Sequence, residues 1–359
     1  MHLSPSEAPV AIQHANPETV RHKLDFLWLE LTNRCNLHCV HCYTDSGPHT
    51  GQRDRLTVQD YESVMRQAFA LGCRKIQLIG GEPQLNADFE RILHLTKEIG
   101  FEFVEVFSNL TRLDEGTVEF AAENGVHFAT SVYSDGPAAH DAITQVRSSH
   151  ARTIRNLKKL IDADVETRAA IIVIDQDKAA VDRTTLFLRD LGVRHVRSSV
   201  VREFGRGEEI LLQQAQMSGL CGHCWAGKLC VAPDGVAYPC VMSRSWPVGN
   251  VLENSLAEIV EGSPLHEMRQ AIFDTVWLPA IASKRVSAVG ANPHFASSAN
   301  CAPEEPTCGP DTGAPDCAPE ISAPQDAPAV TEECPQSCVP DESTCGPIAC
   351  PQCCDPNLI

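Results

Sequence analysis

The stretch Phe26-Leu-Trp-Leu-Glu-Leu-Thr-Asn-Arg-Cys-Asn-Leu-His-Cys-Val-His-Cys-Tyr43 joins a short apolar segment to three closely spaced cysteines. Its first seven residues have the length and composition of a buried β-strand. Cys35, Cys39 and Cys42 follow with the spacing C-x3-C-x2-C. Three thiolates are one fewer than the four that complete a [4Fe–4S] cluster, so one iron would keep an open position for a small molecule. Structural zinc is the alternative, but its sites are closed by four ligands and usually begin C-x2-C.

A second motif comes one helix and one strand later. Residues 75–79 form a short apolar strand pattern, and Gly80-Gly81-Glu82-Pro83 follows directly. Two glycines permit positive φ and a close approach of the backbone to a ligand, and the proline fixes the turn. The alternative is an ordinary strand-to-helix turn, because glycine and proline mark such turns in many proteins.

With both motifs present at this separation, the sequence resembles the radical S-adenosylmethionine (SAM) enzymes. In that family an aromatic residue usually precedes the last cysteine, and the planar ring of His41 stands at this position here. The resemblance implies that the three cysteines hold a [4Fe–4S] cluster whose open iron binds SAM. It also implies that the second motif binds SAM and that Glu82 orients the amino group. The residues assigned to SAM in this turn are Gly80, Gly81, Glu82 and Pro83.

Helical and strand patterns alternate along the next 150 residues. Helices are expected at 57–71, 88–99, 114–124, 151–162 and 179–191, and strands at 75–79, 103–107, 127–132, 167–174 and 195–200. Strands separated by helices of this length indicate βαβ units and a parallel sheet. Counting the first strand gives six units, too few for a closed eight-stranded barrel. Six units match the α/β fold that the resemblance implies, an open (β/α)6 partial barrel of the TIM type with ligands at the carboxyl ends of its strands.

Polar residues stand near three of these expected strands. Asn109 follows the third, Ser131 ends the fourth, and Arg168 begins the fifth. In the family, polar residues at the fourth strand contact the SAM ribose, and a basic residue often holds its carboxylate. The resemblance therefore implies that Asn109, Ser131 and Arg168 also bind SAM. Solvated loop residues are the alternative interpretation.

A second group of cysteines begins at residue 221. Cys221 and Cys224 have C-x2-C spacing, and a Pro-Asp-Gly turn at 233–235 is expected to fold two short strands so that Cys240 meets Cys224. A zinc ribbon is the alternative, because four cysteines within twenty residues suit zinc equally well. With Gly249-Asn250, the segment resembles the SPASM or twitch extension of peptide-modifying radical SAM enzymes. The resemblance implies an auxiliary iron–sulfur cluster held by Cys221, Cys224 and Cys240.

Residues 301–359 have an unusual composition. They hold nine of the seventeen cysteines, twelve of the twenty-four prolines and eleven acidic residues, with no Lys, Arg or aromatic residue. Such a segment cannot bury enough apolar surface to offset the entropy of ordering, so we expect it to be disordered unless metal organises it. Three interpretations stay open: thiolates that complete an auxiliary cluster, a metal-scavenging or partner-docking arm, and a spacer.

Charge and hydropathy limit the partners and the cellular locations that suit this chain. The net charge of −18 becomes −7 without the eleven acidic residues of 301–359, which argues against nucleic acid. No run of eighteen apolar residues suits a membrane span, and the first 24 residues show no secretory signal, so we expect a cytoplasmic location. The expected parts are an N-terminal arm (1–24), the partial barrel (25–205), a SPASM-like domain (206–275), and a linker with the Cys- and Pro-rich acidic tail (276–359).

The sequence thus predicts a radical SAM enzyme that reductively cleaves SAM and abstracts a hydrogen from a peptide. The resemblance favours maturation, by crosslinking, of a ribosomally synthesised peptide. The expected partners are a precursor peptide, an electron donor such as flavodoxin or ferredoxin, and a separate leader-peptide-binding protein. One alternative is a radical SAM enzyme that modifies sulfatases or builds a small cofactor. The other is a non-enzymatic iron–sulfur or zinc scaffold, which would not cleave SAM after chemical reduction.

Overall fold

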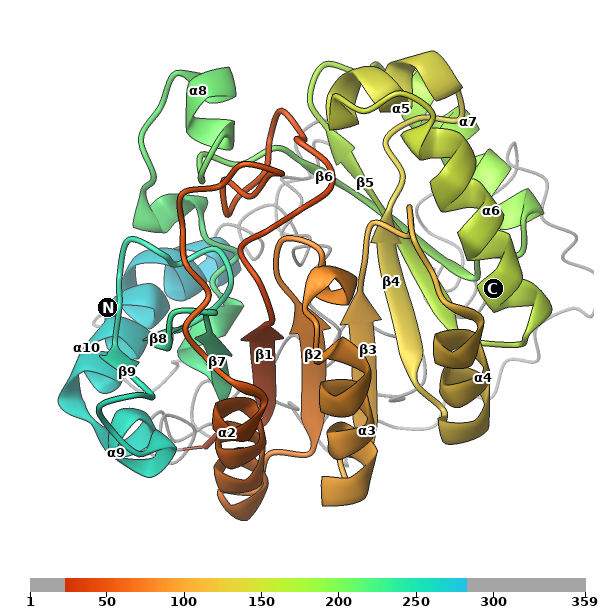
Figure 1. Ribbon diagram of the computed structural model, residues 1–359. Coiled ribbons are helices and arrows are strands. Elements are labelled where there is room, and N and C mark those ends of the chain that lie inside the picture. The colour runs from red at the N-terminus through yellow and green to blue at the C-terminus, as the bar shows by residue number, and fades with distance from the viewer. Residues whose placement is uncertain (1–22, 283–359) are drawn as a thin grey trace, which may run out of the picture.

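The computed structural model describes residues 23–282, and the predictions for residues 301–359 lie outside this part of the chain. Six parallel strands form the predicted open partial barrel, each beside its predecessor in the sequence (Figure 1). These strands are β1 (Phe26–Glu30), β2 (Lys75–Ile79), β3 (Phe103–Phe107), β4 (His127–Ser131), β5 (Thr167–Val173) and β6 (His195–Val200). The expected α/β fold and strand order are confirmed.

The sheet continues beyond β1 into the second cysteine region. Strand β7 (Lys228–Val231) pairs in parallel with β1, and β8 (Val236–Tyr238) and β9 (Gly249–Asn250) add antiparallel strands. The expected Pro-Asp-Gly turn joins β7 and β8, and its Gly235 has a φ of +90° that favours glycine. The cysteine-containing hairpin is therefore an extension of the barrel sheet.

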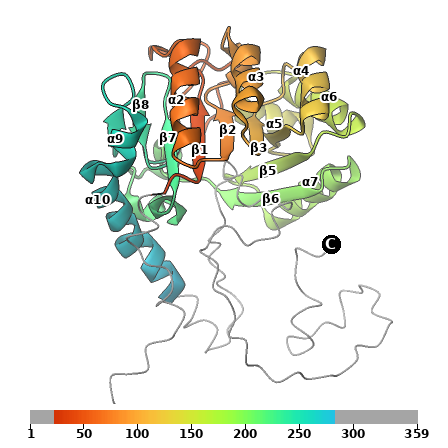
Figure 2. The ribbon, with the colours of Figure 1, turned by 90° about the horizontal axis from the view of Figure 1, so that it is seen from below.

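Helices α2, α3, α4 and α6 lie on one side of the sheet and leave the opposite side of the barrel open (Figure 2). Thr57 caps α2 through a reciprocal capping box with Asp60. The helices of the barrel are α2 (Val58–Ala70), α3 (Phe89–Ile99), α4 (Glu115–Asn124), α5 (Pro137–Thr144), α6 (Ser149–Asp162) and α7 (Lys178–Asp190). Within residues 23–282, no helix has both the length and the apolarity that a membrane crossing needs.

Several helical segments were not predicted. Helix α5 has only eight residues and begins at Pro137, so it offers little apolar periodicity to detect. The chain stays helical through residue 282, past residue 276 where the linker is expected to begin. The remaining segments are η2 (Pro83–Leu85), α8 (Gly207–Leu211), η3 (Met217–Gly219), η4 (His223–Trp225), α10 (Ser263–Ile272) and the π-helical η5 (Phe273–Trp277). By contrast, α9 (Leu256–Glu261) lies where the sequence predicts an amphipathic helix, around 255–261.

Strand β1 is buried on both faces and divides two apolar cores. Leu27 and Leu29 belong to the core between the sheet and its covering helices. Phe26 and Trp28 belong to a second core that also contains Trp225 of the second cysteine region. The barrel and the C-terminal extension therefore both contribute side chains to this second core, and β1 lies at the junction of the two parts.

A buried ion pair also joins these two parts. The Glu30 carboxylate at the end of β1 is fully buried and accepts a hydrogen bond from the Arg244 guanidinium, four residues after Cys240. Burial raises the pKa of Glu30, and the positive charge of Arg244 opposes that rise. The Tyr61 hydroxyl of α2 donates to the Glu30 backbone oxygen at 2.9 Å.

We predict that Arg244→Met lowers the free energy of unfolding by about 3–5 kcal/mol, because it leaves the Glu30 carboxylate buried without its partner. The double variant Glu30→Leu/Arg244→Met should recover most of this loss, since both charges are then removed. Urea denaturation at matched metal content measures both. An equal loss in the single and double variants would contradict an ion-pair origin.

Candidate functional site

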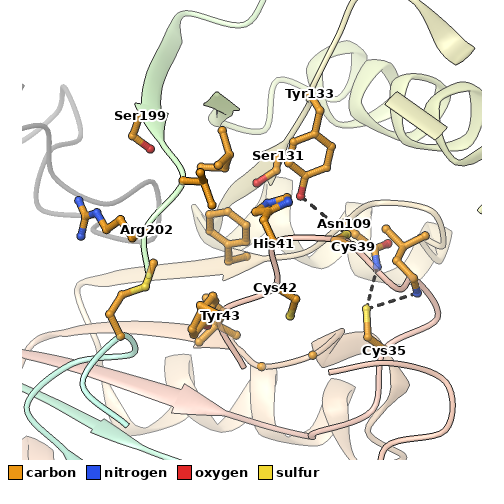
Figure 3. A pocket seen from close by; sticks show the side chains of 18 of the residues that line it. Cys35, Cys39, His41, Cys42, Tyr43, Asn109, Ser131, Tyr133, Ser199 and Arg202 are labelled. Carbon is orange, nitrogen blue, oxygen red and sulfur yellow. Dashed lines mark hydrogen bonds between the residues drawn. The ribbon is translucent and has the colours of Figure 1, made fainter. Parts of the chain in front are cut away.

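A cavity of about 990 Å³, including its open mouth, lies at the carboxyl ends of the barrel strands. The first cysteine loop, the backbone of the second motif and residues at the ends of β3 and β4 line the same space. Figure 3 shows the three cysteines of the loop together with Asn109 and Ser131. Among the residues predicted from sequence, those that line it are Cys35, Cys39, Cys42, Gly80, Gly81, Asn109 and Ser131. The topology therefore brings together residues that are separated by up to 96 positions in the chain.

The start of the cysteine loop is fixed by backbone contacts with the second motif. The Gly81 amide donates to the Thr32 carbonyl at 2.8 Å, and the Glu82 amide donates to the Arg34 carbonyl at 2.9 Å. A Cβ on Gly81 would lie 2.3 Å from the Arg34 carbonyl oxygen, and Gly80 adopts a φ of +141°. Both glycines are thus required for the turn to lie this close to the loop.

The end of the cysteine loop is held by Arg206, which the sequence analysis missed. Its guanidinium donates to the Cys39 carbonyl at 2.8 Å, to the Ser46 carbonyl at 2.8 Å and to the Asp45 carboxylate at 2.6 Å. Its amide also donates to the Cys42 carbonyl at 3.0 Å. Because the planar guanidinium presents several fixed donors, one side chain can hold three points of an irregular loop.

The missed helix α5 holds the middle of the loop. The His38 and Val40 amides donate to the Thr144 and Ile143 carbonyls at 3.1 and 3.0 Å. These carbonyls belong to the last turn of α5, where helical backbone acceptors remain unused. Helix α5 therefore supplies a surface against which the cysteine loop is laid.

Two polar side chains point toward the cysteine sulfurs (Figure 3). The side-chain amide nitrogen (Nδ2) of Asn109 lies 3.7 Å from the Cys35 Sγ, and the Tyr133 hydroxyl lies 3.9 Å from the Cys39 Sγ. The Tyr133 ring also contacts the His41 ring edge-on, with centroids 5.0 Å apart. Donors near a thiolate ligand adjust its orientation and charge, so Tyr133 joins the site although the sequence analysis did not select it.

The surroundings of the thiols fit an iron-containing group. Burial raises the pKa of Cys39 to about 12 and also raises that of Cys35, so burial alone disfavours their thiolates. A bound metal deprotonates a thiol ligand outright and supplies the positive charge that offsets this cost. Burial also lowers the pKa of His41 to about 4, which keeps its ring neutral near neutral pH.

Two predicted SAM ligands have other partners. The Glu82 carboxylate is buried and does not line the cavity, because it accepts hydrogen bonds from the Ser108 hydroxyl and the Asn109 amide, both at 2.8 Å. Arg168 lies at the amino end of β5 and forms a bidentate ion pair with Glu105 of β3. We therefore withdraw Arg168 from the site, and we assign Glu82 to the connection between the second motif and β3.

Pro83, the fourth residue of the second motif, begins η2 and is buried outside the cavity lining. The basic residue that does line the cavity is Arg202, just after β6 (Figure 3). It lies two residues beyond the last expected strand, 195–200, where no site residue was predicted. A basic residue just after a strand was the signal that could have identified it.

The second cysteine group also gathers. Side-chain hydrogen bonds with Cys221 and Cys240, together with burial, raise the pKa of the Cys224 thiol. The β7–β8 hairpin brings Cys240 to the Cys221–Cys224 segment, as predicted. Cys230 is a buried β7 residue opposite Trp28 of β1, in the shared core. Among residues 23–282, no three His, Cys, Asp or Glu side chains are close enough to hold a single metal ion.

Comparison with known families agrees with this arrangement. Residues 29–188 match the radical SAM superfamily model. This part of the chain is a radical SAM domain. Residues 202–279 match the SPASM model, an iron–sulfur cluster-binding domain. These matches confirm the predicted cofactors, which are a [4Fe–4S] cluster, SAM and an auxiliary iron–sulfur cluster, whereas the ligands of each stay predictions.

Two curated relatives from Bacillus subtilis each align with about two thirds of the chain. The antilisterial bacteriocin subtilosin biosynthesis protein AlbA is 23% identical over 276 residues, covering 67% of this chain and 60% of AlbA. The sporulation killing factor maturation protein SkfB is 26% identical over 270 residues, covering 66% of this chain and 64% of SkfB. The chain thus spans less than two thirds of the length of these relatives.

The fold is also similar to that of a solved structure. Streptococcus suis SuiB bound to its precursor peptide SuiA matches with a TM-score of 0.59 and 15% identity, over 72% of this chain and 70% of SuiB. At this identity the likeness supports the fold alone.

We predict that Arg206→Ala increases hydrogen exchange in residues 39–46 and lowers iron incorporation, because the loop loses three side-chain contacts. Arg206→Lys should restore only part of the protection from exchange and part of the iron content, since one ammonium cannot replace the several fixed donors of a guanidinium. Arg183→Ala, which removes an exposed guanidinium on α7, is the matched control. Unchanged exchange in the Arg206 variants would contradict this role.

We also predict that Gly81→Ala lowers iron incorporation by shifting the start of the cysteine loop, because the added Cβ would overlap the Arg34 carbonyl. Gly51→Ala is the control, since nothing lies within 4 Å of a Cβ at that position. Iron per chain after anaerobic reconstitution is the measurement. Equal iron in both variants would mean that the close contact is not needed.

Proposed function

We propose that this protein is a radical SAM enzyme that abstracts hydrogen from a peptide, in the maturation of a ribosomally made product. The observation that carries the proposal is the single cavity shared by the three cysteines, Gly80 and Gly81. The combination of radical SAM and SPASM domains supports it, and so do relatives named for bacteriocin and killing-factor maturation. An electron donor of the flavodoxin or ferredoxin class, a leader-peptide-binding protein and a cytoplasmic location belong to the same proposal.

The first cysteine group would hold the [4Fe–4S] cluster, which with bound SAM supplies reductive cleavage to methionine and the hydrogen-abstracting 5′-deoxyadenosyl radical. Gly80 and Gly81 present backbone to the space beside the cysteines and would bind the methionyl part of SAM. Asn109 and Ser131, at the ends of β3 and β4, would bind its polar groups.

Apolar side chains form much of the remaining wall of the cavity. Phe107, Ile172 and Met242 are among the apolar residues that line it. Exclusion of water by such a wall protects a reactive radical from side reactions. These residues would therefore restrict the radical to a substrate carbon held in the cavity.

The second cysteine group adjoins the same wall. Cys221, Cys224 and Cys240 would hold the auxiliary cluster, and Met242 is only two residues from Cys240 while lining the cavity. The hairpin that carries Cys240 therefore ends at the cavity. This placement suits a cluster that serves the substrate part of the reaction.

We expect Cys35→Ala/Cys39→Ala/Cys42→Ala to remove one cluster, about four irons per chain, and to abolish 5′-deoxyadenosine formation. Cys240→Ala should lower iron while 5′-deoxyadenosine still forms, because the SAM-binding site is intact. Iron analysis and chromatography of reduced, SAM-treated protein measure both. A triple variant that keeps all its iron, or protein that binds zinc instead, would contradict the proposal.

A further inference from the structure

Strand β6, an edge strand of the described sheet, forms part of the cavity wall. Ser199, Val200 and Arg202 line the cavity, and Val200 is 61% exposed. Arg197 is exposed as well, and it faces the same side of β6 as Ser199 because strand side chains alternate. Among residues 23–282, Arg202 is the only Lys, Arg, Asp or Glu that lines the cavity.

The described chain ends on the open side of the barrel. Figure 2 shows the end of the helical segment that continues from α10 on that side. Residues 283–300 separate it from Cys301, the first cysteine of the acidic tail, and they can span at most about 60 Å. A compact body of this size has a radius of gyration of roughly 18 Å, so residues 301–359 can reach the cavity of their own chain.

The tail sequence has the charge and the reactive groups that this site would accept. Its eleven acidic residues and lack of Lys and Arg complement the basic boundary at Arg197 and Arg202. Its nine cysteines supply thiols close to many abstractable carbon-bound hydrogens. Attachment to the same chain gives an effective concentration that can reach the order of millimolar, so even weak docking suffices.

We propose that residues 301–359 are a substrate segment of this enzyme, docked in cis along β6 and modified by sulfur-to-carbon crosslinks. The inference rests on the proposed function and adds the identity of the peptide. Its acidic side chains pair with the basic edge at Arg197 and Arg202, and successive cysteines enter the cavity.

The chemistry balances with one electron donor and one electron acceptor. A one-electron reductant, such as reduced flavodoxin or dithionite, cleaves SAM to methionine and a 5′-deoxyadenosyl radical, which removes a hydrogen atom from a tail carbon. The cysteine sulfur bonds to that carbon, its proton goes to solvent, and one electron passes to an acceptor of the iron–sulfur class. Each crosslink therefore removes two hydrogens from the tail and releases one 5′-deoxyadenosine.

The test uses two full-length chains with separable masses. Unlabelled protein is mixed with ¹⁵N-labelled Cys35→Ala/Cys39→Ala/Cys42→Ala protein, reconstituted anaerobically, and incubated with SAM and dithionite. Peptides from residues 301–359 are then examined by mass spectrometry. We expect two-hydrogen losses in the unlabelled tail only, at a rate independent of protein concentration. Equal modification of the labelled tail would overturn action in cis.

Other outcomes separate this inference from the proposed function. Formation of 5′-deoxyadenosine with an unmodified tail would overturn the inference and leave the radical SAM activity intact. No 5′-deoxyadenosine at all would overturn the proposed function. A full chain with the nine tail cysteines changed to serine should keep its iron, and loss of iron would mean that the tail ligates metal.

Docking has a readout that needs no cofactor. Hydrogen exchange across residues 195–202 is compared between the native chain and a chain whose eleven tail carboxylates are changed to amides, which keeps length and shape. We expect slower exchange in the native chain and loss of that difference in high salt, which screens charge pairs. Arg197→Glu/Arg202→Glu should abolish the difference at low salt. Identical exchange in all three proteins would overturn the docking.

Discussion

The contact between the Gly80–Gly81 turn and the backbone of residues 32–34 has no room for a Cβ, and the site depends on it. The cysteine loop has no regular structure of its own, so its position comes from what it touches. Gly81 fixes its start, the end of α5 supports its middle, and Arg206 holds its end. Three cysteines therefore face one cavity because the turn after β2, the end of α5 and Arg206 after β6 all contact one loop.

The two parts of the chain that carry the cysteine groups are joined by a shared apolar core and by an ion pair. Strand β1 contributes Phe26 and Trp28 to the core that also holds Cys224 and Cys240. It ends at Glu30, whose buried charge is paired with Arg244 in the extension. The extension thereby has a fixed position relative to the barrel, and this lets its hairpin form part of the cavity wall.

Local pattern predicted most of the fold and the centre of the site. The strand patterns, the two cysteine groups and the glycine turn are short-range signals, and the structure places them as expected. The partners of Arg206, Glu82 and Arg168 could not be predicted this way. Arg206 meets Cys39 across 167 positions, and Glu82 meets Ser108 across 26, so only the folded chain reveals these contacts. Helix α5 was missed because its support comes from tertiary contacts rather than periodicity.

The proposed chemistry requires the cavity to bind SAM beside a cluster held by the first cysteine group. Electron paramagnetic resonance of the reduced protein, with and without SAM, tests this requirement. We expect SAM to change the cluster signal, and the change to persist when Cys221, Cys224 and Cys240 are replaced by alanine. A signal that SAM leaves unaltered, or a SAM-sensitive signal that disappears with the second group, would contradict it.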